Sequence, residues 1–402
     1  MKTSSYGWAM KLSLLSISML LTSYNAIAGA LPALIKQFPE QSRTNVELLS
    51  TAPTCAMIVM IIVSGFLART VSDRALVITG ICIATVFGII PFFLTSNFWL
   101  IMASRIGLGI GLGLINSLAV SLIGKYFSGE ERATLMGFRS AFVALGQATL
   151  TLIAGLLLNL GWHGPFLLYV LAIPVLILFV SFVPKDPATP ATPALSDTPQ
   201  KQRVNAPILL ITAFLFVTVT MYTGVTVRLS SIITTNAFGS MQQASTLLSV
   251  MIFCGMLMGF AFGRLHRILK GQTLTLGVLF LTVGCFLIFL APNFPVLCLG
   301  ALVSGLSYPT MIAYCFNKIN EVCPPRSANL CTSVVLVGCN LSIFTAPYML
   351  KLSSMLVSSE SLQSPFLVYG ILLTLIALVY GLWSARITKR RSTIPGDSAI
   401  PR

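Results

Sequence analysis

The chain has 402 residues, of which 56% are hydrophobic and 9% are charged, and its net charge is +15. A soluble domain of this size would carry far more charged surface, so the composition excludes an ordinary soluble globular protein and indicates a lipid environment. A bilayer core takes about 20 apolar residues per helix, so this length suits roughly a dozen membrane crossings.

Charged residues, Pro and Gly divide the chain into twelve apolar segments, which predict twelve membrane-spanning helices. We expect these spans near residues 12–35, 46–68, 75–95, 99–123, 133–158, 165–183, 207–231, 244–263, 272–290, 295–316, 327–350 and 364–384. The first segment is interpreted as a span and not as a cleaved signal peptide, because cleavage would invert the charge bias of every later loop.

One long polar stretch lies between the sixth and seventh predicted spans, and it is rich in Pro. Such a stretch is typical of an extended linker. The prediction is therefore an N-terminal six-helix bundle at 1–183, a cytoplasmic linker at 184–206, and a C-terminal six-helix bundle with a short basic tail at 207–402. The fold class is an all-α membrane protein of two pseudo-symmetric bundles.

The two halves also resemble each other in sequence. Gly65-Phe-Leu-Ala-Arg69 at the end of the second span matches Gly263-Arg-Leu-His-Arg267 at the end of the eighth, 198 positions later. Leu31 and Ile35 match Leu229 and Ile233 at the same offset. A duplicated unit is indicated, and in transporters built from such units the solute binds near the bilayer midplane between the repeats.

The basic residues are distributed unevenly between the two sides of the predicted membrane. With the amino terminus inside, nineteen of the 25 Lys and Arg residues lie on the cytoplasmic side, and only Lys36, Arg43 and Lys351 lie outside. The positive-inside rule therefore places both termini in the cytoplasm of a multi-pass protein of the inner or plasma membrane. The excess charge suits anionic lipid of the inner leaflet, so no nucleic-acid partner is expected.

Features of an enzyme or a metal protein are missing from the sequence. The nine cysteines never form a CxxC motif, and the two histidines fall in predicted loops on opposite sides. No cofactor, metal or disulfide framework follows from them, and without clustered acids, bases or nucleophiles an enzyme is not expected. A sensor or receptor lacks support because no soluble domain is evident.

Three arginines lie inside predicted spans: Arg105, Arg139 and Arg228. A charge inside the bilayer costs at least about 2.5–3.5 kcal/mol, so each is a candidate site residue. Arg105 could bind a substrate anion or take part in proton coupling, or it could donate to backbone carbonyls of the first or fifth span. Arg139 could instead reach the lipid headgroups, and Arg228 could simply anchor its helix at the outer surface.

Acidic residues are nearly absent from the spans. Only Glu47, one of ten acidic residues, touches a span, and it does so at the end. Exporters of hydrophobic cations usually need a buried carboxylate, whereas a guanidinium suits a carboxylate or phosphate ester. An anionic or neutral solute is therefore favoured.

Several motifs resemble those of the major facilitator superfamily, over essentially the whole chain. The loop Gly65-Phe-Leu-Ala-Arg69-Thr-Val-Ser-Asp73-Arg74 is similar to that family's loop after the second span, although Arg69 replaces its usual Asp. The fourth span carries Arg105-x-x-x-Gly109-x-x-x-Gly113, and Gly129 to Gly137 resembles the loop into the fifth span. The family's antiporter motif in the fifth span is incomplete, because Leu150-Thr151 replaces its Gly-Pro pair.

The resemblance implies a divergent bacterial-type member of the drug and organic-solute branch, with a cavity lined by spans one, four, seven and ten. Uncharged polar residues near mid-span are further candidates, with the Tyr24-Asn25 pair foremost, although helix–helix hydrogen bonds explain such residues equally well. The predicted substrate-binding set is Tyr24, Asn25, Arg105, Asn116, Arg139, Gln147, Tyr222, Arg228, Tyr308 and Asn340.

In the resembled fold, charged loops on the cytoplasmic side lock one of two alternating conformations. We hypothesise that Arg69 pairs with Glu130 or Glu131, although these loops could merely carry topology charges. The predicted gating set is Gly65, Arg69, Arg74, Glu130, Glu131, Gly263 and Arg267.

These observations predict a secondary active transporter of a small anionic or neutral organic solute. We expect it to work as a monomer in the bilayer, by rocker-switch alternating access coupled to protons. The alternative is a multidrug or metabolite efflux antiporter.

Overall fold

The computed structural model describes residues 7–67, 70–93, 97–184, 203–324, 327–357, 359 and 361–392. Within these ranges the chain is built from helices and short connections, without a strand. The predicted all-α membrane fold is confirmed.

The helices up to residue 182 are α1 (Trp8–Leu20), η1 (Ser23–Ala30), α2 (Leu31–Gln37), α3 (Arg43–Thr51), α4 (Pro53–Leu67), α5 (Asp73–Phe93), α6 (Phe98–Tyr126), α7 (Gly129–Leu157), η2 (Leu158–Leu160), η3 (Gly164–Leu171) and α8 (Ala172–Phe182). Those from residue 206 onward are α9 (Ala206–Thr235), α10 (Met241–Leu269), α11 (Gln272–Leu290), α12 (Phe294–Val322), α13 (Ala328–Val357) and α14 (Ser364–Ser392).

Eleven helices among the described residues are long and apolar enough to cross a membrane. The number becomes twelve when the bent pair Trp8–Leu20 and Ser23–Gln37, which meet at an angle of 43°, is counted as one span. Each predicted span corresponds to one of these segments. The second differs at its start, because its helix begins at Arg43 and not near residue 46.

Helix starts repeat between the two halves of the chain. Asn97 caps α6 by accepting from the backbone N–H groups of Trp99 and Leu100, and Asn293 caps α12 by accepting from Val296. An Asn side chain at this position satisfies an N–H group that has no partner inside the helix. A phenylalanine follows the cap in both cases, so the two helices begin with the same Asn-Phe sequence.

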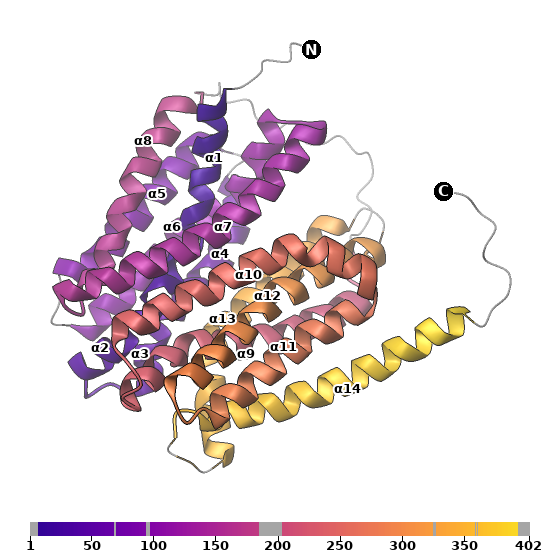
Figure 1. The fold of residues 1–402 in the computed structure, drawn as a ribbon. Coiled ribbons are helices and arrows are strands. Elements are labelled where there is room, and N and C mark those ends of the chain that lie inside the picture. Colours follow the sequence, from indigo (N-terminus) through magenta and orange to yellow (C-terminus); the bar gives the residue numbers. More distant parts are fainter. Residues whose placement is uncertain are drawn as a thin grey trace.

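The helix pairs that pack most extensively are also repeated. Spans three and four pack together as α5 with α6, and spans nine and ten do so as α11 with α12. The pairs α4 with α6, α1 with α7, and α5 with α8 correspond in the same way to α10 with α12, α9 with α13, and α11 with α14. Figure 1 shows α1 to α8 gathered on one side of the molecule and α9 to α14 on the other.

Glycines allow the close packing of α6. A Cβ atom at Gly109 would lie 2.2 Å from the carbonyl oxygen of Pro53 on α4, and one at Gly111 would lie 2.5 Å from the backbone nitrogen of Ala84 on α5. These approaches are too short for any side chain. The glycines of the fourth span therefore serve helix packing within the first half.

The two halves contact each other on the side away from the start of α1 and the end of α14, here called the opposite side. A Cβ atom at Gly29 on η1 or Gly155 on α7 would lie 1.9 or 2.4 Å from Ser245 on α10, and the Ser249 hydroxyl of α10 donates to the Ala148 carbonyl of α7. Toward the side of the two termini, here called the termini side, the bundles diverge (Figure 1).

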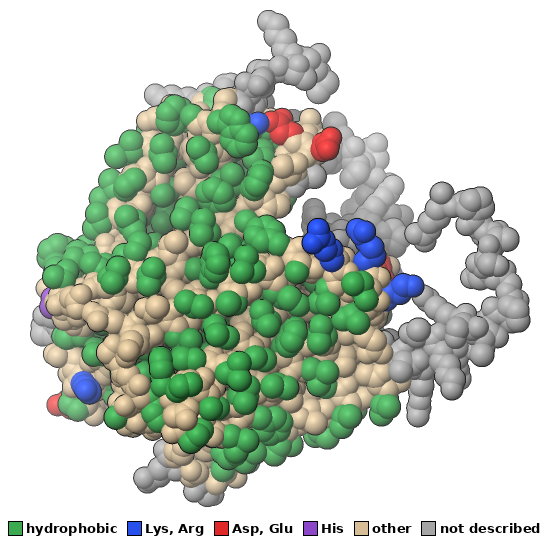
Figure 2. Space-filling model, viewed as in Figure 1, with side chains coloured by type: hydrophobic (Ala, Val, Ile, Leu, Met, Phe, Trp, Pro, Cys, Tyr) green, Lys and Arg blue, Asp and Glu red, His purple; other side chains and the backbone are tan. Residues whose placement is uncertain are grey.

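The predicted domain limits cannot all be compared with the structure, because most of the linker at 184–206 lies outside the described residues. Hydrophobic side chains cover much of the outer surface of both halves, and the surface is hollowed between the start of α7 and the end of α10 (Figure 2). This arrangement is that of two helical bundles in lipid, joined at one side and parted at the other.

Candidate functional site

Three tyrosines lie at the middle of their spans, where the halves converge. Tyr24 belongs to η1, Tyr222 to α9 and Tyr308 to α12. The rings of Tyr222 and Tyr308 are stacked, with centroids 4.8 Å apart and planes 20° apart. Tyr24 lies in the neighbourhood of Tyr308. The structure thus brings together three predicted site residues from spans one, seven and ten.

The three hydroxyl groups differ from most polar groups of the interior in that none of them bonds another described residue. Tyr222 is 9% exposed and Tyr24 is 6% exposed, so both are buried, whereas Tyr308 is half-buried. Stacked aromatic faces with free hydroxyls suit a small polar solute, because they offer both apolar contact and hydrogen-bond capacity. Tyr24 and Tyr222 are also separated by 198 positions, the offset of the internal repeat.

Arg105 is fully buried on α6, and three of its nitrogens donate to protein groups. Its Nε lies 2.9 Å from the Leu49 carbonyl, Nη2 lies 2.6 Å from the Tyr24 carbonyl, and Nη1 lies 2.8 Å from the Tyr169 hydroxyl. Of the two roles open from the sequence, this geometry favours hydrogen bonding to carbonyls, here of spans one and two and not of span five. The guanidinium holds the break in the first span and has no exposed surface for a solute.

The first span needs such a partner because its helix is interrupted. Carbonyl groups freed at a helix break must be bonded elsewhere when no water is present. The Ser23 carbonyl accepts from the Tyr169 hydroxyl at 3.2 Å, and the Tyr24 carbonyl accepts from Arg105. The pair Arg105 and Tyr169 therefore fixes the segment that presents Tyr24.

Tyr169 was not identified from the sequence, although a signal was present. It lies in Pro165-Phe166-Leu-Leu-Tyr169, which matches Pro365-Phe366-Leu-Val-Tyr369 200 positions later. Tyr169 and Tyr369 are 1% and 2% exposed, at corresponding places in spans six and twelve. A search for repeated tyrosines would have found both.

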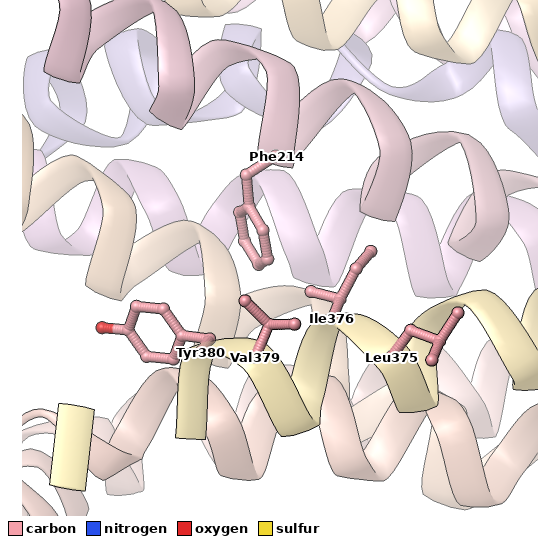
Figure 3. Close-up of a pocket in the computed structure, with 5 residues that line it drawn as sticks. All are labelled: Phe214, Leu375, Ile376, Val379 and Tyr380. Atoms are coloured by element: carbon pink, nitrogen blue, oxygen red, sulfur yellow. The ribbon is translucent and has the colours of Figure 1, made fainter. Parts of the chain in front are cut away.

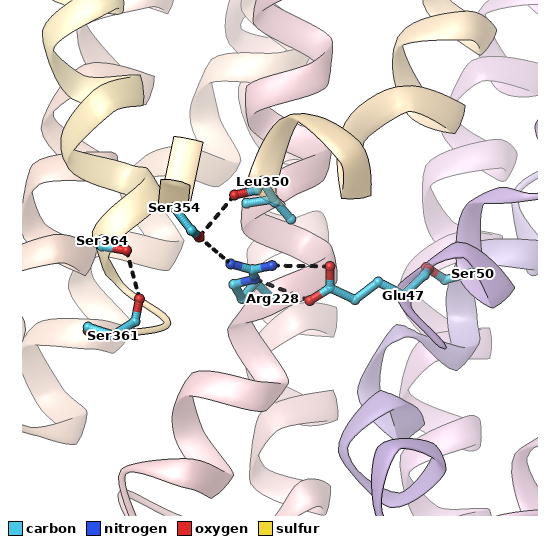
Figure 4. A network of polar contacts seen from close by, with 7 residues as sticks. All are labelled: Glu47, Ser50, Arg228, Leu350, Ser354, Ser361 and Ser364. Atoms are coloured by element: carbon cyan, nitrogen blue, oxygen red, sulfur yellow. Dashed lines mark hydrogen bonds and ion pairs between the residues drawn. The ribbon is translucent and has the colours of Figure 1, made fainter. Parts of the chain in front are cut away.

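Glu47 and Arg228 form an ion pair between the two halves (Figure 4). Nε of Arg228 lies 3.1 Å from Oε1 of Glu47, and Nη2 lies 3.2 Å from Oε2, so the guanidinium binds the carboxylate through two parallel bonds. The third nitrogen, Nη1, donates to the Ser354 hydroxyl of α13 at 3.3 Å. The Glu47 side chain is 0% exposed and that of Arg228 is 5% exposed.

The importance of Glu47 was missed because the sequence placed it at the outer limit of a span. In the structure α3 begins four residues before it, at Arg43, with Ser42 as the N-cap. This extra turn carries the carboxylate inside the protein, where a buried charge must be paired. Arg228, predicted as a site residue or a helix anchor, is its partner.

Among the described residues, the remaining predicted binding residues form no hydrogen bond with the three tyrosines. Arg139 on α7 is half-buried and forms no bond with another described residue, and its Nε is buried without a partner. The amide oxygen of Asn25 is likewise buried and unpaired. Asn340 donates to the Leu336 carbonyl of its own helix. Asn116 and Gln147 are half-buried on α6 and α7.

The described members of the predicted gating set lie near helix ends on the termini side. Arg74 donates to the Val180 and Val183 carbonyls at the end of α8. Glu131 pairs with Lys11 on α1 at 2.6 Å, whereas Glu130 and Arg267 are exposed and Gly263 has open space around it. Gly65 lies in the last turn of α4. Arg69 is outside the described residues, so its predicted pairing stays a prediction.

An apolar pocket of about 400 Å³ lies between α9 and α14, and its lining includes none of Tyr24, Tyr222 and Tyr308. Figure 3 shows the five side chains that line it: Phe214, Leu375, Ile376, Val379 and Tyr380. Val379 is 71% exposed, so the pocket opens on the outer surface of the helices. Without converging polar groups it does not resemble a site for a polar solute.

The chain is similar in sequence to one protein family and to individual known proteins. A family model described as the Major Facilitator Superfamily matches residues 13–347. Protein spinster homolog 3 of Danio rerio is 29% identical over 123 residues, which cover 30% of this chain and 24% of that protein. The Probable L-galactonate transporter of Escherichia coli (strain K12) is 35% identical over 75 residues, which cover 18% of this chain and 17% of that protein. The chain thus matches about a quarter or less of the length of these relatives.

Solved structures match over nearly the whole chain at low identity. A crystal structure of the nucleoside transporter NupG has a TM-score of 0.75 and 12% identity, and covers 93% of this chain and 99% of that one. A bacterial homologue of the human lysosomal transporter Spinster, in an inward-facing and unoccupied conformation, has a TM-score of 0.71 and 14% identity, with 96% and 99% covered. At such identities the likeness concerns the fold alone.

Proposed function

We propose that the chain, which belongs to the Major Facilitator Superfamily, moves a small anionic or neutral organic solute in exchange for, or together with, protons. Membership of this family makes it a membrane transporter of solutes and not an enzyme. The single observation that carries the proposal is the buried Glu47–Arg228 pair, which joins the two halves on one side of the tyrosine site. The proposed bodies are residues 1–183 and 207–402, and their relative rocking exposes the site to each side in turn.

The conformation described here is assigned to the inward-open state. Supporting this, the basic residues of the sequence favour the termini side as cytoplasmic, and the halves part on that side (Figure 1). The opposite side is then extracellular or periplasmic. The contacts of Ser245 and Ser249 and the inter-half ion pair of Glu47 with Arg228 close it.

Proton coupling is proposed to act through Glu47. Glu47 is a fully buried carboxylate in a membrane-spanning helix. Its only charged hydrogen-bond partner among the described residues is Arg228, which belongs to the other half. Protonation removes the negative charge and weakens the pair, because a neutral acid binds a guanidinium less strongly than a carboxylate does. Proton binding at Glu47 would therefore favour opening of the opposite side.

The proposed solute site is the group of Tyr24, Tyr222 and Tyr308. These residues supply aromatic faces and three free hydroxyls but no negative charge, and the sequence places no acid near mid-span. The site therefore lacks the carboxylate that would neutralise a lipophilic cation inside the bilayer. Arg139 on α7, which forms no bond with another described residue, is the proposed contributor of positive charge.

The relatives and structural neighbours define a panel of test solutes. Their names include L-galactonate and nucleosides, and a further structural match is a D-xylose–proton symporter. All three solutes are small polar molecules, with or without a carboxylate. Purified protein is reconstituted into liposomes that contain a pH-sensitive dye, and L-galactonate, uridine, D-xylose and tetraphenylphosphonium are added separately. We expect proton flux with a carboxylate or a neutral solute, and a reduced flux in Tyr222→Ala at solute concentrations below saturation.

Two results would contradict the proposal. One is proton flux with tetraphenylphosphonium alone, which would indicate the efflux antiporter. The other is solute flux in Glu47→Gln that depends on the pH gradient as in the natural sequence, because coupling through Glu47 requires an ionisable group there. The direction of proton movement relative to solute separates symport from antiport.

A further inference from the structure

A second charged group accompanies the inter-half ion pair. Arg43 lies four residues before Glu47 on α3, and residues with this spacing share one face of a helix. Arg43 interacts electrostatically with both Glu47 and Arg228. It is half-buried, and its Nη1 is buried without a hydrogen-bond partner among the described residues.

Two further unpaired polar atoms lie on the same helix faces as the members of the pair. The Thr51 hydroxyl lies four residues after Glu47 on α3, and the Ser231 hydroxyl lies three residues after Arg228 on α9, so both share a helix face with a member of the pair. Both are buried, and neither forms a hydrogen bond with another described residue. Buried polar groups are nearly always bonded, so a cluster of unpaired donors indicates a partner that binds there.

The charges of the cluster do not balance. Two guanidinium groups and one carboxylate leave a net charge of +1 among Arg43, Glu47 and Arg228. Buried charge in a membrane protein is normally neutralised by a partner. One monoanion would neutralise this cluster and accept from Arg43 Nη1, whereas a dianion would reverse the imbalance.

We propose that Arg43, Arg228 and the neighbouring hydroxyls form a binding site for a monocarboxylate, at which the transported anion docks from the opposite side. The site rests on the proposed transport function and names its substrate class as a singly charged carboxylate. Glu47 occupies one part of the Arg228 fork in the closed conformation, and Arg43 supplies the unused donor. The site is separate from the tyrosines, which lie deeper at mid-span.

The test uses full-length protein in lipid nanodiscs and formate as the probe, with chloride replaced at constant ionic strength. Thermal unfolding is followed by intrinsic tryptophan fluorescence. We expect formate to raise the unfolding temperature saturably. In Glu47→Gln the half-saturating concentration should fall about tenfold, because a competing negative charge is removed next to the two arginines. Malonate, a dianion, should bind more weakly than formate to the natural sequence.

Two double variants distinguish the site from general anion effects. Glu47→Gln with Arg43→Gln should lose the formate response, whereas Glu47→Gln with Lys351→Gln should keep it, because Lys351 is an exposed charge on α13 of the same side. A saturable response that survives Arg43→Gln, or no saturable response in Glu47→Gln, would overturn the proposal.

A third measurement separates a transport site from an adventitious ion only. In proteoliposomes, Arg43→Gln should raise the KM for L-galactonate more than it changes the maximal rate, and leave flux of uridine unaffected. An unchanged KM for a transported carboxylate would refute docking at Arg43. Absence of any solute flux would instead count against the proposed function, while formate binding by purified protein would still decide the anion site.

Discussion

The inter-half ion pair predicts a large effect of Glu47→Gln on the balance between conformations. Arg228 is 5% exposed in the closed arrangement, and its side chain would lose the carboxylate that accepts from two of its nitrogens. Removing one partner of a buried ion pair costs about 3–5 kcal/mol. Because Arg228 becomes hydrated when the opposite side opens, we expect this cost to fall on the closed conformation.

A cost at the lower end of that range shifts a two-state equilibrium by about 100-fold. The shift is measured by double electron–electron resonance between spin labels placed by non-natural amino acids at Leu160 and Thr235, two exposed positions on the opposite side of the two halves. In Glu47→Gln the distance distribution should move to longer values, which correspond to opening of this side.

Two controls test the physical reasoning. Glu321→Gln removes the same charge from an exposed pair with Lys318 within α12, which contributes about 1 kcal/mol or less, so the label distances should not change. Exchanging the residues in Glu47→Arg with Arg228→Glu should restore the short distance in part. If Glu47→Gln retains the distance distribution of the natural sequence, the pair does not hold the halves together.

Three further predictions follow from the packing. Arg105→Lys should lower the unfolding temperature by several degrees without changing solute preference, because the single nitrogen of a lysine cannot reach the Leu49, Tyr24 and Tyr169 groups at once. A change in substrate selectivity without loss of stability would contradict this structural role. Tyr222→Ala should weaken solute binding about tenfold while Tyr222→Phe, which keeps the stack on Tyr308, has a smaller effect, as measured by the KM for proteoliposome uptake; equal effects would point to the hydroxyl and not the ring. Gly109→Ala should destabilise the protein, because its Cβ would lie 2.2 Å from the Pro53 carbonyl oxygen. Gly137→Ala, whose Cβ would have nothing within 4 Å, should instead stabilise α7 by about 0.5–1 kcal/mol. Thermal unfolding of the two variants measures the difference.

The sequence was sufficient for the number of spans and their order. The bilayer determines the length of each apolar segment and the position of the charged residues between segments. It acts on each helix separately, so local sequence patterns predict the spans. The break in the first span was not predicted. It depends on Arg105 and Tyr169, which are distant in sequence and bond the carbonyls of Ser23 and Tyr24.

The candidate site was predicted in part, for a similar reason. The sequence alone shows a polar residue within an apolar segment, so it was sufficient to select Tyr24, Tyr222 and Tyr308 as candidates. The pairing of Glu47 with Arg228 was not, because 181 residues separate them and the start of the second helix was placed too late. Arg105 was weighed for both roles, and only its three bonds favour the structural one.

The two halves use the same aromatic residue with an arginine in different ways. In the first half the repeated tyrosine Tyr169 bonds Arg105, and both hold a helix break inside that half. In the second half Tyr369 packs beside Gly224, one turn from Arg228, with which it interacts electrostatically. That arginine bonds Glu47 of the other half. The repeated tyrosine is thus present in both halves, while one arginine stabilises a helix break and the other connects the two halves, which separate in the proposed mechanism. The first arginine is therefore expected to govern stability and the second to govern conformational exchange.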